Sequence, residues 1–138
     1  MKAFINSTIF TGDKLLTNRV ILVDGTKISG ITSSLPDNVE IFDCKDTILA
    51  PGLIDLQIYG GGGYLFSSSL SGESLHAIAN DLVSKGTTGF FITLATNSFQ
   101  VFRKAVEVVR DFPHPAVLGI QLEGPYINPL KKGAHLEK

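Results

Sequence analysis

Alternation between two kinds of segment after residue 47 limits most strongly what this chain can fold into. Strands are predicted at 53–59, 89–95 and 116–122, because these runs are apolar at nearly every position, as in buried parallel strands. Helices are predicted at 74–85 and 98–110, where apolar residues recur every three or four positions. The resulting β-α-β-α-β order indicates a parallel sheet with right-handed crossovers.

This α/β region is too short to be a closed architecture. A (β/α)₈ barrel needs ~250 residues and a doubly wound sheet somewhat fewer, whereas the whole chain has 138. Three strands and two helices therefore form only part of such a fold.

Capping residues help to place both predicted helices. Ser71 is the predicted N-cap of the first helix, and Gly86 lies where a C-terminal glycine is expected. The second helix is expected to begin after Asn97 or Ser98 and to end before Pro113. Its apolar stripe is predicted from the residues in helical register, namely Phe99, Phe102, Val106 and Val109.

The first 49 residues have a different pattern, with short β segments separated by turn residues. Strands are predicted at 3–5, 8–10, 19–23, 27–31 and 39–43, and Asp24-Gly25 is a hairpin dipeptide. No segment here has helical periodicity, so we expect a small β-sandwich or sheet. The expected domains are thus 1–49, a β-sandwich segment, and 50–138, the α/β region. The apolar run 48–50, at the boundary between them, is interpreted as a buried strand of α/β type.

Charge and composition exclude several classes of function. The net charge is −1 and the longest basic run is Lys131-Lys132, so no surface for nucleic acid or an anionic membrane is expected. The apolar runs are far shorter than the ~20 residues that cross a bilayer, and the N-terminus lacks the apolar region of a signal peptide. Cys44 is alone, which excludes an internal disulfide. We expect a cytoplasmic protein.

Two strand ends carry candidate site residues. Asp55, Gln57 and Tyr59 share one face of the first predicted strand and reach its carboxyl end, where barrels keep their active sites. Glu123 ends the third predicted strand, and a carboxylate there is costly to bury without a cation or partner. Glutamate suits zinc or iron as one member of a mixed ligand set. A purely structural interpretation is also open for each strand end. The first strand could simply enter a core, and Glu123 could simply face solvent.

The remaining candidates are less specific. His135 follows Glu123 by 12 residues, in a loop with two lysines that could attract an anionic substrate, although such a loop can equally be plain surface. The glycine run 60–63 could approach a ligand closely, but it lacks the spacing of nucleotide-binding motifs. His76 and His114 are interpreted as surface or structural residues.

The motifs along the chain, taken in order, resemble one family. They are Ala-Pro-Gly-Leu-Ile-Asp at 50–55, Lys-Gly-Thr-Thr-Gly-Phe-Phe at 85–91 and Leu-Glu-Gly-Pro-Tyr-Ile-Asn-Pro-Leu-Lys-Lys-Gly-Ala-His at 122–135. With them the chain resembles the N-terminal portion of the N-acetylglucosamine-6-phosphate deacetylase family, in the amidohydrolase superfamily. The segment 122–135 is the most specific. The resemblance implies an incomplete (β/α)₈ barrel, its first three strands, preceded by part of a small β-sandwich domain.

The resemblance also implies roles for individual residues. Glu123 matches a metal ligand, and Ala134 and His135 match the pair that contacts the sugar substrate. Gln57 falls where many amidohydrolases have the first histidine of a His-x-His metal motif, so it is expected to line the active site and one metal is expected rather than two. At position 59, where this branch of the family is expected to have asparagine, the chain has Tyr59.

For the complete enzyme, the resemblance implies one divalent metal, zinc or iron, and hydrolysis of the N-acetyl amide of a small amino-sugar phosphate. The products would be acetate and glucosamine 6-phosphate, and the full-length protein would be a homo-oligomer, a dimer. The family's catalytic aspartate and two metal-binding histidines would follow Lys138, so no catalytic residue is predicted within this chain, which we expect to be inactive alone. The alternatives are an amidohydrolase acting on cyclic amides, like dihydropyrimidinase, and a non-catalytic stand-alone binding module.

Overall fold

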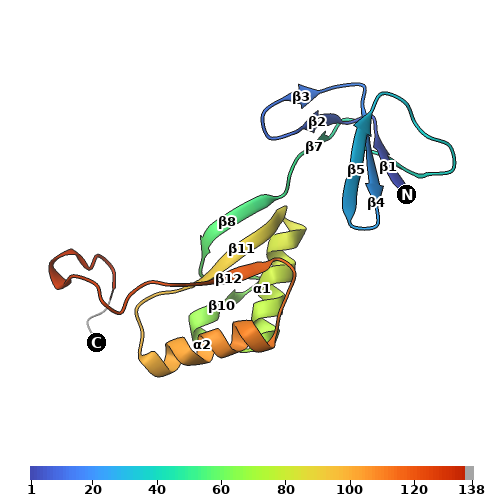
Figure 1. The fold of residues 1–138 in the computed structure, drawn as a ribbon. Helices are drawn as coiled ribbons and strands as arrows, with labels where there is room; N and C mark the ends of the chain where they lie inside the picture. Colours follow the sequence, from blue (N-terminus) through green and yellow to red (C-terminus); the bar gives the residue numbers. More distant parts are fainter. Residues whose placement is uncertain (136–138) are drawn as a thin grey trace. The chain divides into compact units, whose positions relative to one another are not determined.

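In the computed structural model, which describes residues 1–135, the chain divides into a β unit, Met1–Pro51, and an α/β unit that begins at Gly52 (Figure 1). The last three residues of the predicted barrel segment, 136–138, lie outside the described residues. The mixed α/β class predicted from the sequence is confirmed. In the part of the chain that the structure describes, no helix has the length and apolar character needed to cross a membrane.

The β unit contains two small sheets. One has the order β5-β4-β1-β6, and the other has the order β3-β2-β7. Their strands are β1 (Lys2–Ile5), β2 (Thr8–Phe10), β3 (Leu15–Leu16), β4 (Val20–Asp24), β5 (Lys27–Thr32), β6 (Glu40–Asp43) and β7 (Ile48–Leu49).

Two details of the β unit differ from the sequence-based prediction. The strand β3 was not predicted, because two residues carry no alternation to detect. The strand β7 was assigned to the α/β region, but it pairs in parallel with β2. An apolar run of two residues fits either unit, and only its hydrogen-bonding partner decides between them.

The α/β unit is built on a three-stranded parallel sheet of order β12-β11-β8. Its strands are β8 (Leu53–Ile58), β11 (Thr87–Leu94) and β12 (Val117–Leu122), and its helices are α1 (Gly72–Ser84) and α2 (Phe99–Asp111). Between β8 and α1 the chain forms a short hairpin, β9 (Gly60–Gly61) and β10 (Tyr64–Leu65), and a 3₁₀ turn, η1 (Phe66–Ser68). A second turn, η2 (Pro129–Lys131), lies in the loop after β12.

Serine caps begin both helices; Ser71 was the predicted cap of the first, and Ser98 is one of the two residues, Asn97 or Ser98, after which the second was expected to begin. The Ser71 side chain accepts the backbone N–H of Ser74 at α1, and that of Ser98 accepts the N–H of Val101 at α2. Each cap satisfies one of the backbone donors that a helix start leaves unpaired. Gly86, just after α1, has a φ of 95°, which an L side chain rarely adopts.

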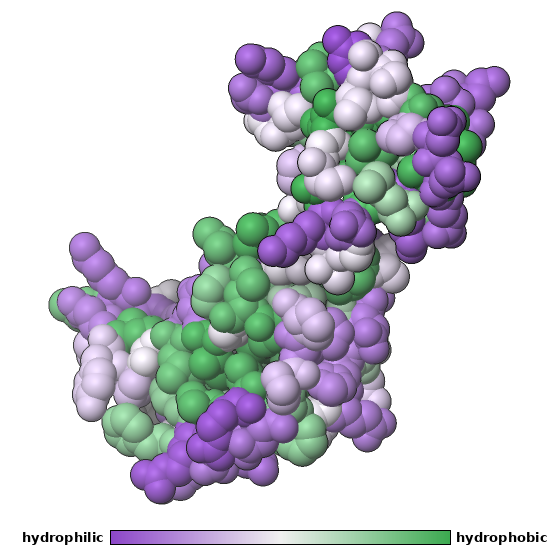
Figure 2. All heavy atoms as spheres, turned by 45° about the vertical axis from the view of Figure 1, so that its right-hand side comes forward, coloured by the Kyte–Doolittle hydropathy of each residue, from purple (hydrophilic) through white to green (hydrophobic). Residues whose placement is uncertain are grey.

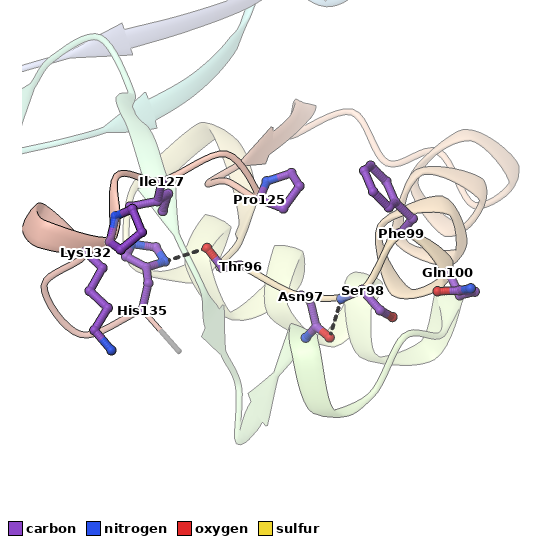
Figure 3. A pocket seen from close by; sticks show the side chains of 10 residues that line it. Thr96, Asn97, Ser98, Phe99, Gln100, Pro125, Ile127, Lys132 and His135 are labelled. Atoms are coloured by element: carbon purple, nitrogen blue, oxygen red, sulfur yellow. Dashed lines mark hydrogen bonds between the residues drawn. The ribbon is translucent and has the colours of Figure 1, made fainter. Parts of the chain in front are cut away.

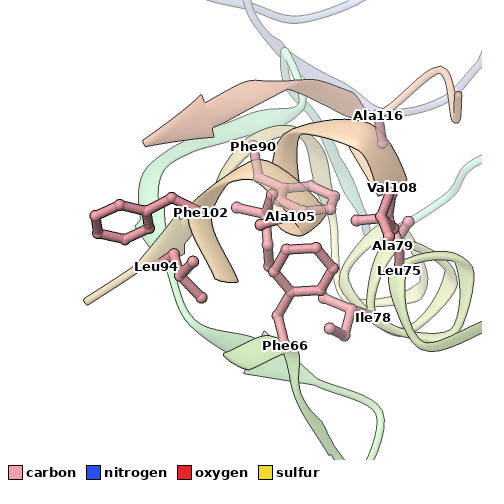
Figure 4. Packing of buried hydrophobic residues seen from close by; sticks show 11 residues of the cluster. Phe66, Leu75, Ile78, Ala79, Phe90, Leu94, Phe102, Ala105, Val108 and Ala116 are labelled. Atoms are coloured by element: carbon pink, nitrogen blue, oxygen red, sulfur yellow. The ribbon is translucent and has the colours of Figure 1, made fainter. Parts of the chain in front are cut away.

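Hydrophobic side chains pack between the sheet and the two helices (Figure 4). The strand β11 contributes Phe90, Ile92 and Leu94, which alternate along the strand and are fully buried. The buried face of α2 is formed by Phe102, Ala105 and Val108. The predicted stripe was therefore partly wrong, since Phe99 and Val106 are 63% and 42% exposed.

The outer strands of this sheet are less covered than predicted. Leu53, Ile54 and Leu56 of β8 are each more than 60% exposed, so this strand is not buried. Side chains of a strand point to the two faces of the sheet, and the elements within residues 1–135 leave these positions of β8 uncovered. Hydrophobic side chains also form a continuous area on the surface of the α/β unit in Figure 2.

Candidate functional site

Glu123 accepts hydrogen bonds on both carboxylate oxygens at the carboxyl end of the parallel sheet. The side-chain amide of Gln57 donates to Oε1, and the Tyr59 hydroxyl donates to Oε2 at 2.7 Å. The Gln57 amide also donates to the Tyr59 hydroxyl, at 2.9 Å. Because Gln57 lies on β8 and Tyr59 directly follows it, parallel pairing through β11 brings them to the same edge as Glu123.

His135 returns to this edge from the loop after β12. Its Nε2 lies 3.9 Å from Oε2 of Glu123, and its Nδ1 lies 2.9 Å from the hydroxyl of Thr96. The same hydroxyl donates to the backbone carbonyl of Glu123 at 3.1 Å. The loop is held by Asn128, which caps η2, and by a hydrogen bond from the backbone N–H of His135 to Lys132.

An open hollow of about 370 Å³ lies at this edge of the sheet. Its lining comprises Tyr59, Ala95, Thr96, Glu123, Ala134 and His135. A second hollow, of about 380 Å³, shares Thr96 and His135 and extends toward the start of α2 (Figure 3). Figure 3 shows the His135 ring directed at Thr96, with Phe99 and Gln100 on the helix side.

The carboxylate of Glu123 changes the acidity of its neighbour. The pKa of the Tyr59 hydroxyl is raised above its usual value, chiefly because the hydroxyl donates to Glu123. The Gln57 amide opposes this effect, because a donor to the phenol oxygen favours the ionised form. Tyr59 is therefore protonated and acts as a hydrogen-bond donor at neutral pH.

The fit of a metal ion can be tested on this donor set. Each carboxylate oxygen of Glu123 uses one of its two acceptor positions for Gln57 or Tyr59, so one on each oxygen is left for a cation. Within residues 1–135, however, no group of three or more histidine, cysteine, aspartate or glutamate side chains could hold a metal ion. The described residues therefore do not form a complete metal site.

The structure brings together all four site residues that the sequence singled out, Gln57, Glu123, Ala134 and His135. It adds Thr96, which nothing in the sequence marks beyond its place two residues after a strand end, and it shows a hydrogen-bonding role for Tyr59.

The other candidates lie outside this hollow. His76 and His114 lie near each other, with ring centroids 5.6 Å apart, and line neither hollow. The glycine run forms the β9–β10 hairpin, where the backbone N–H of Gly62 donates to Asp81 of α1.

No protein-family model matches the chain. In sequence it is 39% identical, over 145 residues, to a human N-acetylglucosamine-6-phosphate deacetylase, a match that covers 97% of this chain and 35% of the relative. The crystal structure of N-acetylglucosamine-6-phosphate deacetylase from Pasteurella multocida matches with a TM-score of 0.92 and 34% identity, over 99% of this chain and 37% of that one. The chain thus spans about a third of the length of these two proteins.

A crystal structure of a D-hydantoinase matches less well. Its TM-score is 0.59 and its identity 22%, over 93% of this chain and 28% of that one. At this identity the likeness shows a shared fold alone.

Proposed function

The chain corresponds, in sequence and in fold, to part of the N-acetylglucosamine-6-phosphate deacetylases, and from this premise we propose that it forms the N-terminal third of such an enzyme. The complete protein hydrolyses the N-acetyl amide of N-acetylglucosamine 6-phosphate to acetate and glucosamine 6-phosphate. The observation that carries the proposal is the convergence of Gln57, Glu123, Ala134 and His135 at one sheet edge.

Among residues 1–135, Glu123 is the residue that we assign as a metal ligand. Its carboxylate is held in one orientation by two donors and keeps an acceptor position open on each oxygen. Carboxylate oxygens bind zinc and iron as members of mixed sets, so the other ligands would come from later strands of the barrel. Because the described residues hold an incomplete set, no catalytic step is assigned to them.

Ala134 and His135 form the substrate side of the hollow. Both line it, and the His135 side chain is 25% exposed, so its ring can be reached from the hollow. The ring nitrogens of an imidazole can hydrogen-bond a polar group such as a sugar hydroxyl or an amide.

The proposal extends to the architecture and assembly of the whole protein. Residues 1–49 form a segment of a β-sandwich and residues 50–138 begin a (β/α)₈ barrel, consistent with two small sheets in the β unit and a parallel β-α-β-α-β order after Gly52. The complete protein is a homo-oligomer, a dimer.

The test uses a protein that joins this chain to the barrel strands it lacks. Glucosamine 6-phosphate formation and bound metal are measured for the wild type, for Glu123→Ala and for the exposed-site control Glu40→Ala. We expect Glu123→Ala to lose metal and to lose activity by on the order of 100-fold or more, while Glu40→Ala keeps both. Stoichiometric metal in Glu123→Ala would overturn the ligand assignment.

Two further arms of the same experiment address the rival functions. Ring opening of a cyclic amide without turnover of the sugar phosphate would favour the dihydropyrimidinase-like reading. The 138-residue chain alone, supplied with zinc or iron, should show no turnover, and activity of the pure chain would favour a self-sufficient module.

A further inference from the structure

The hydroxyl of Thr96 makes two hydrogen bonds that together fix where the protons lie. Thr96 follows β11 by two residues, and its Oγ1 lies 3.1 Å from the backbone carbonyl of Glu123 and 2.9 Å from Nδ1 of His135. A carbonyl oxygen can only accept, so the single hydroxyl proton of Thr96 goes to Glu123. Nδ1 of His135 must then donate its own proton to Oγ1.

The opposite tautomer of His135 makes fewer hydrogen bonds. If the proton were on Nε2, Nδ1 would accept the Thr96 proton and the Glu123 carbonyl would lose that donor. The Nε2–H group would face Oε2 of Glu123 at 3.9 Å, which is too far for a hydrogen bond. The Nδ1–H form therefore has one hydrogen bond more.

Close packing keeps the Thr96 hydroxyl in place. Gly124 has a φ of 94°, and a Cβ built on it would lie 2.4 Å from Oγ1 of Thr96. The backbone after β12 can approach the hydroxyl this closely only because residue 124 is glycine. Thr96 is partly buried, so water competes poorly for its two bonds.

We propose that Thr96 is a positioning residue that holds neutral His135 as its Nδ1–H tautomer, so that Nε2 faces the hollow as a hydrogen-bond acceptor. Nε2 then selects a ligand that donates there, through a hydroxyl or an amide N–H. That this ligand is the amino-sugar substrate rests on the proposed function; the tautomer itself does not.

The experiment reads the tautomer directly in the 138-residue chain. Frozen-solution ¹⁵N NMR of histidine-labelled protein separates protonated from bare ring nitrogens and tolerates self-association. The pH is set about two units above the ordinary imidazole pKa of about 6.5, so that the rings are neutral. The chain has three histidines, and His135→Gln identifies the signals of residue 135.

His114 supplies an internal reference in the same unit. Its Nδ1 accepts the backbone N–H of Ala116 at 3.1 Å, so it must be the opposite, Nε2–H tautomer. We expect His135 to be in the Nδ1–H form by roughly tenfold, the ratio that one ordinary hydrogen bond gives. Thr96→Ser should retain this form, and Thr96→Val should shift the population toward Nε2–H.

An Nε2–H signal from wild-type His135, with His114 as expected, would overturn the proposal, as would an unchanged tautomer in Thr96→Val. If Thr96→Val fails to fold, the signals of His114 also change. The tautomer of His135 in the wild type and in Thr96→Ser then tests the proposal. Failure of the complete protein to act on the sugar phosphate would contradict the proposed function but would not affect the assignment of the His135 tautomer.

Discussion

At the scale of single residues, His135 contacts Thr96 and lies 3.9 Å from Glu123, too far for a hydrogen bond, which fits the proposed assignment of His135 to the substrate and Glu123 to the metal. In the complete protein we predict that His135→Ala lowers kcat/KM by about tenfold or more, the loss expected for one hydrogen bond, and leaves the metal content intact. Steady-state kinetics and metal analysis check both. His76 lies on α1 and does not line the hollow, so His76→Ala is the control and should change neither quantity. Loss of metal in His135→Ala would make the ring a ligand.

His114 gives a prediction about pH. Its pKa is lowered, first by burial and then by the charge of nearby His76. Because the folded state binds the proton less readily than the unfolded state, the stabilising effect is complete above the ordinary pKa of about 6.5 and is lost as the pH falls below it. Ring ¹⁵N spectra recorded between about pH 5 and 8 should show that His114 titrates below the ordinary imidazole pKa of about 6.5. In His76→Gln the pKa should rise part of the way back, and no change would exclude the charge effect.

Single residues also show how far the sequence led toward the site. Glu123 and Gln57 were predictable because parallel strands bring their carboxyl ends to one edge. Ala134 and His135 depended on a specific motif, since the path of a long loop is not readable from periodicity. Thr96 could not have been predicted, because one hydroxyl bridging two distant segments leaves no pattern in the sequence.

At the scale of elements, β11 is the centre of the α/β unit, and its buried aromatic residue should be worth far more than an exposed one. Phe90 is 0% exposed and Phe99 63% exposed. We predict that Phe90→Ala lowers the free energy of unfolding by ~3–5 kcal/mol through a cavity in the core, whereas Phe99→Ala changes it by about 0.5 kcal/mol or less. Urea unfolding of both variants compares them, and equal losses would contradict the placement of the core.

The order of strands and helices in the α/β unit was readable from the sequence, because long periodic segments with serine caps leave little freedom. Which strand side chains are buried by neighbouring elements was harder to predict. An apolar strand reads as buried whether or not a neighbour exists to bury it, so β8 was expected to be covered and is exposed. The position of Phe99 in the first turn of α2 likewise escaped the helical pattern.

At the scale of the whole molecule, the parallel sheet within residues 1–135 ends at β8 and β12, each with a strand neighbour on one side only, and β8 carries exposed apolar side chains. Such edges pair readily with another chain, so we predict that the 138-residue chain self-associates in a concentration-dependent way, measured by sedimentation. Leu56→Lys should weaken association, because a buried lysine in a strand-to-strand contact is costly.

Leu130→Lys is the matched control for this effect, since Leu130 is 94% exposed and lies in η2, away from the sheet. It should leave association unchanged. A wild-type chain that sediments as a monomer at all concentrations and melts cooperatively would contradict the incomplete-barrel proposal.

The sheet order β12-β11-β8 repeats the order of the chain, and this has a consequence for biosynthesis. Each strand leaving the ribosome finds its neighbour already made, so the sheet can grow one strand at a time from the N-terminus. The hollow is different, because it needs His135 from the far loop. We therefore expect nascent chains in which β12 has left the ribosome but His135 has not to protect the sheet amides from hydrogen exchange while the hollow is still unformed.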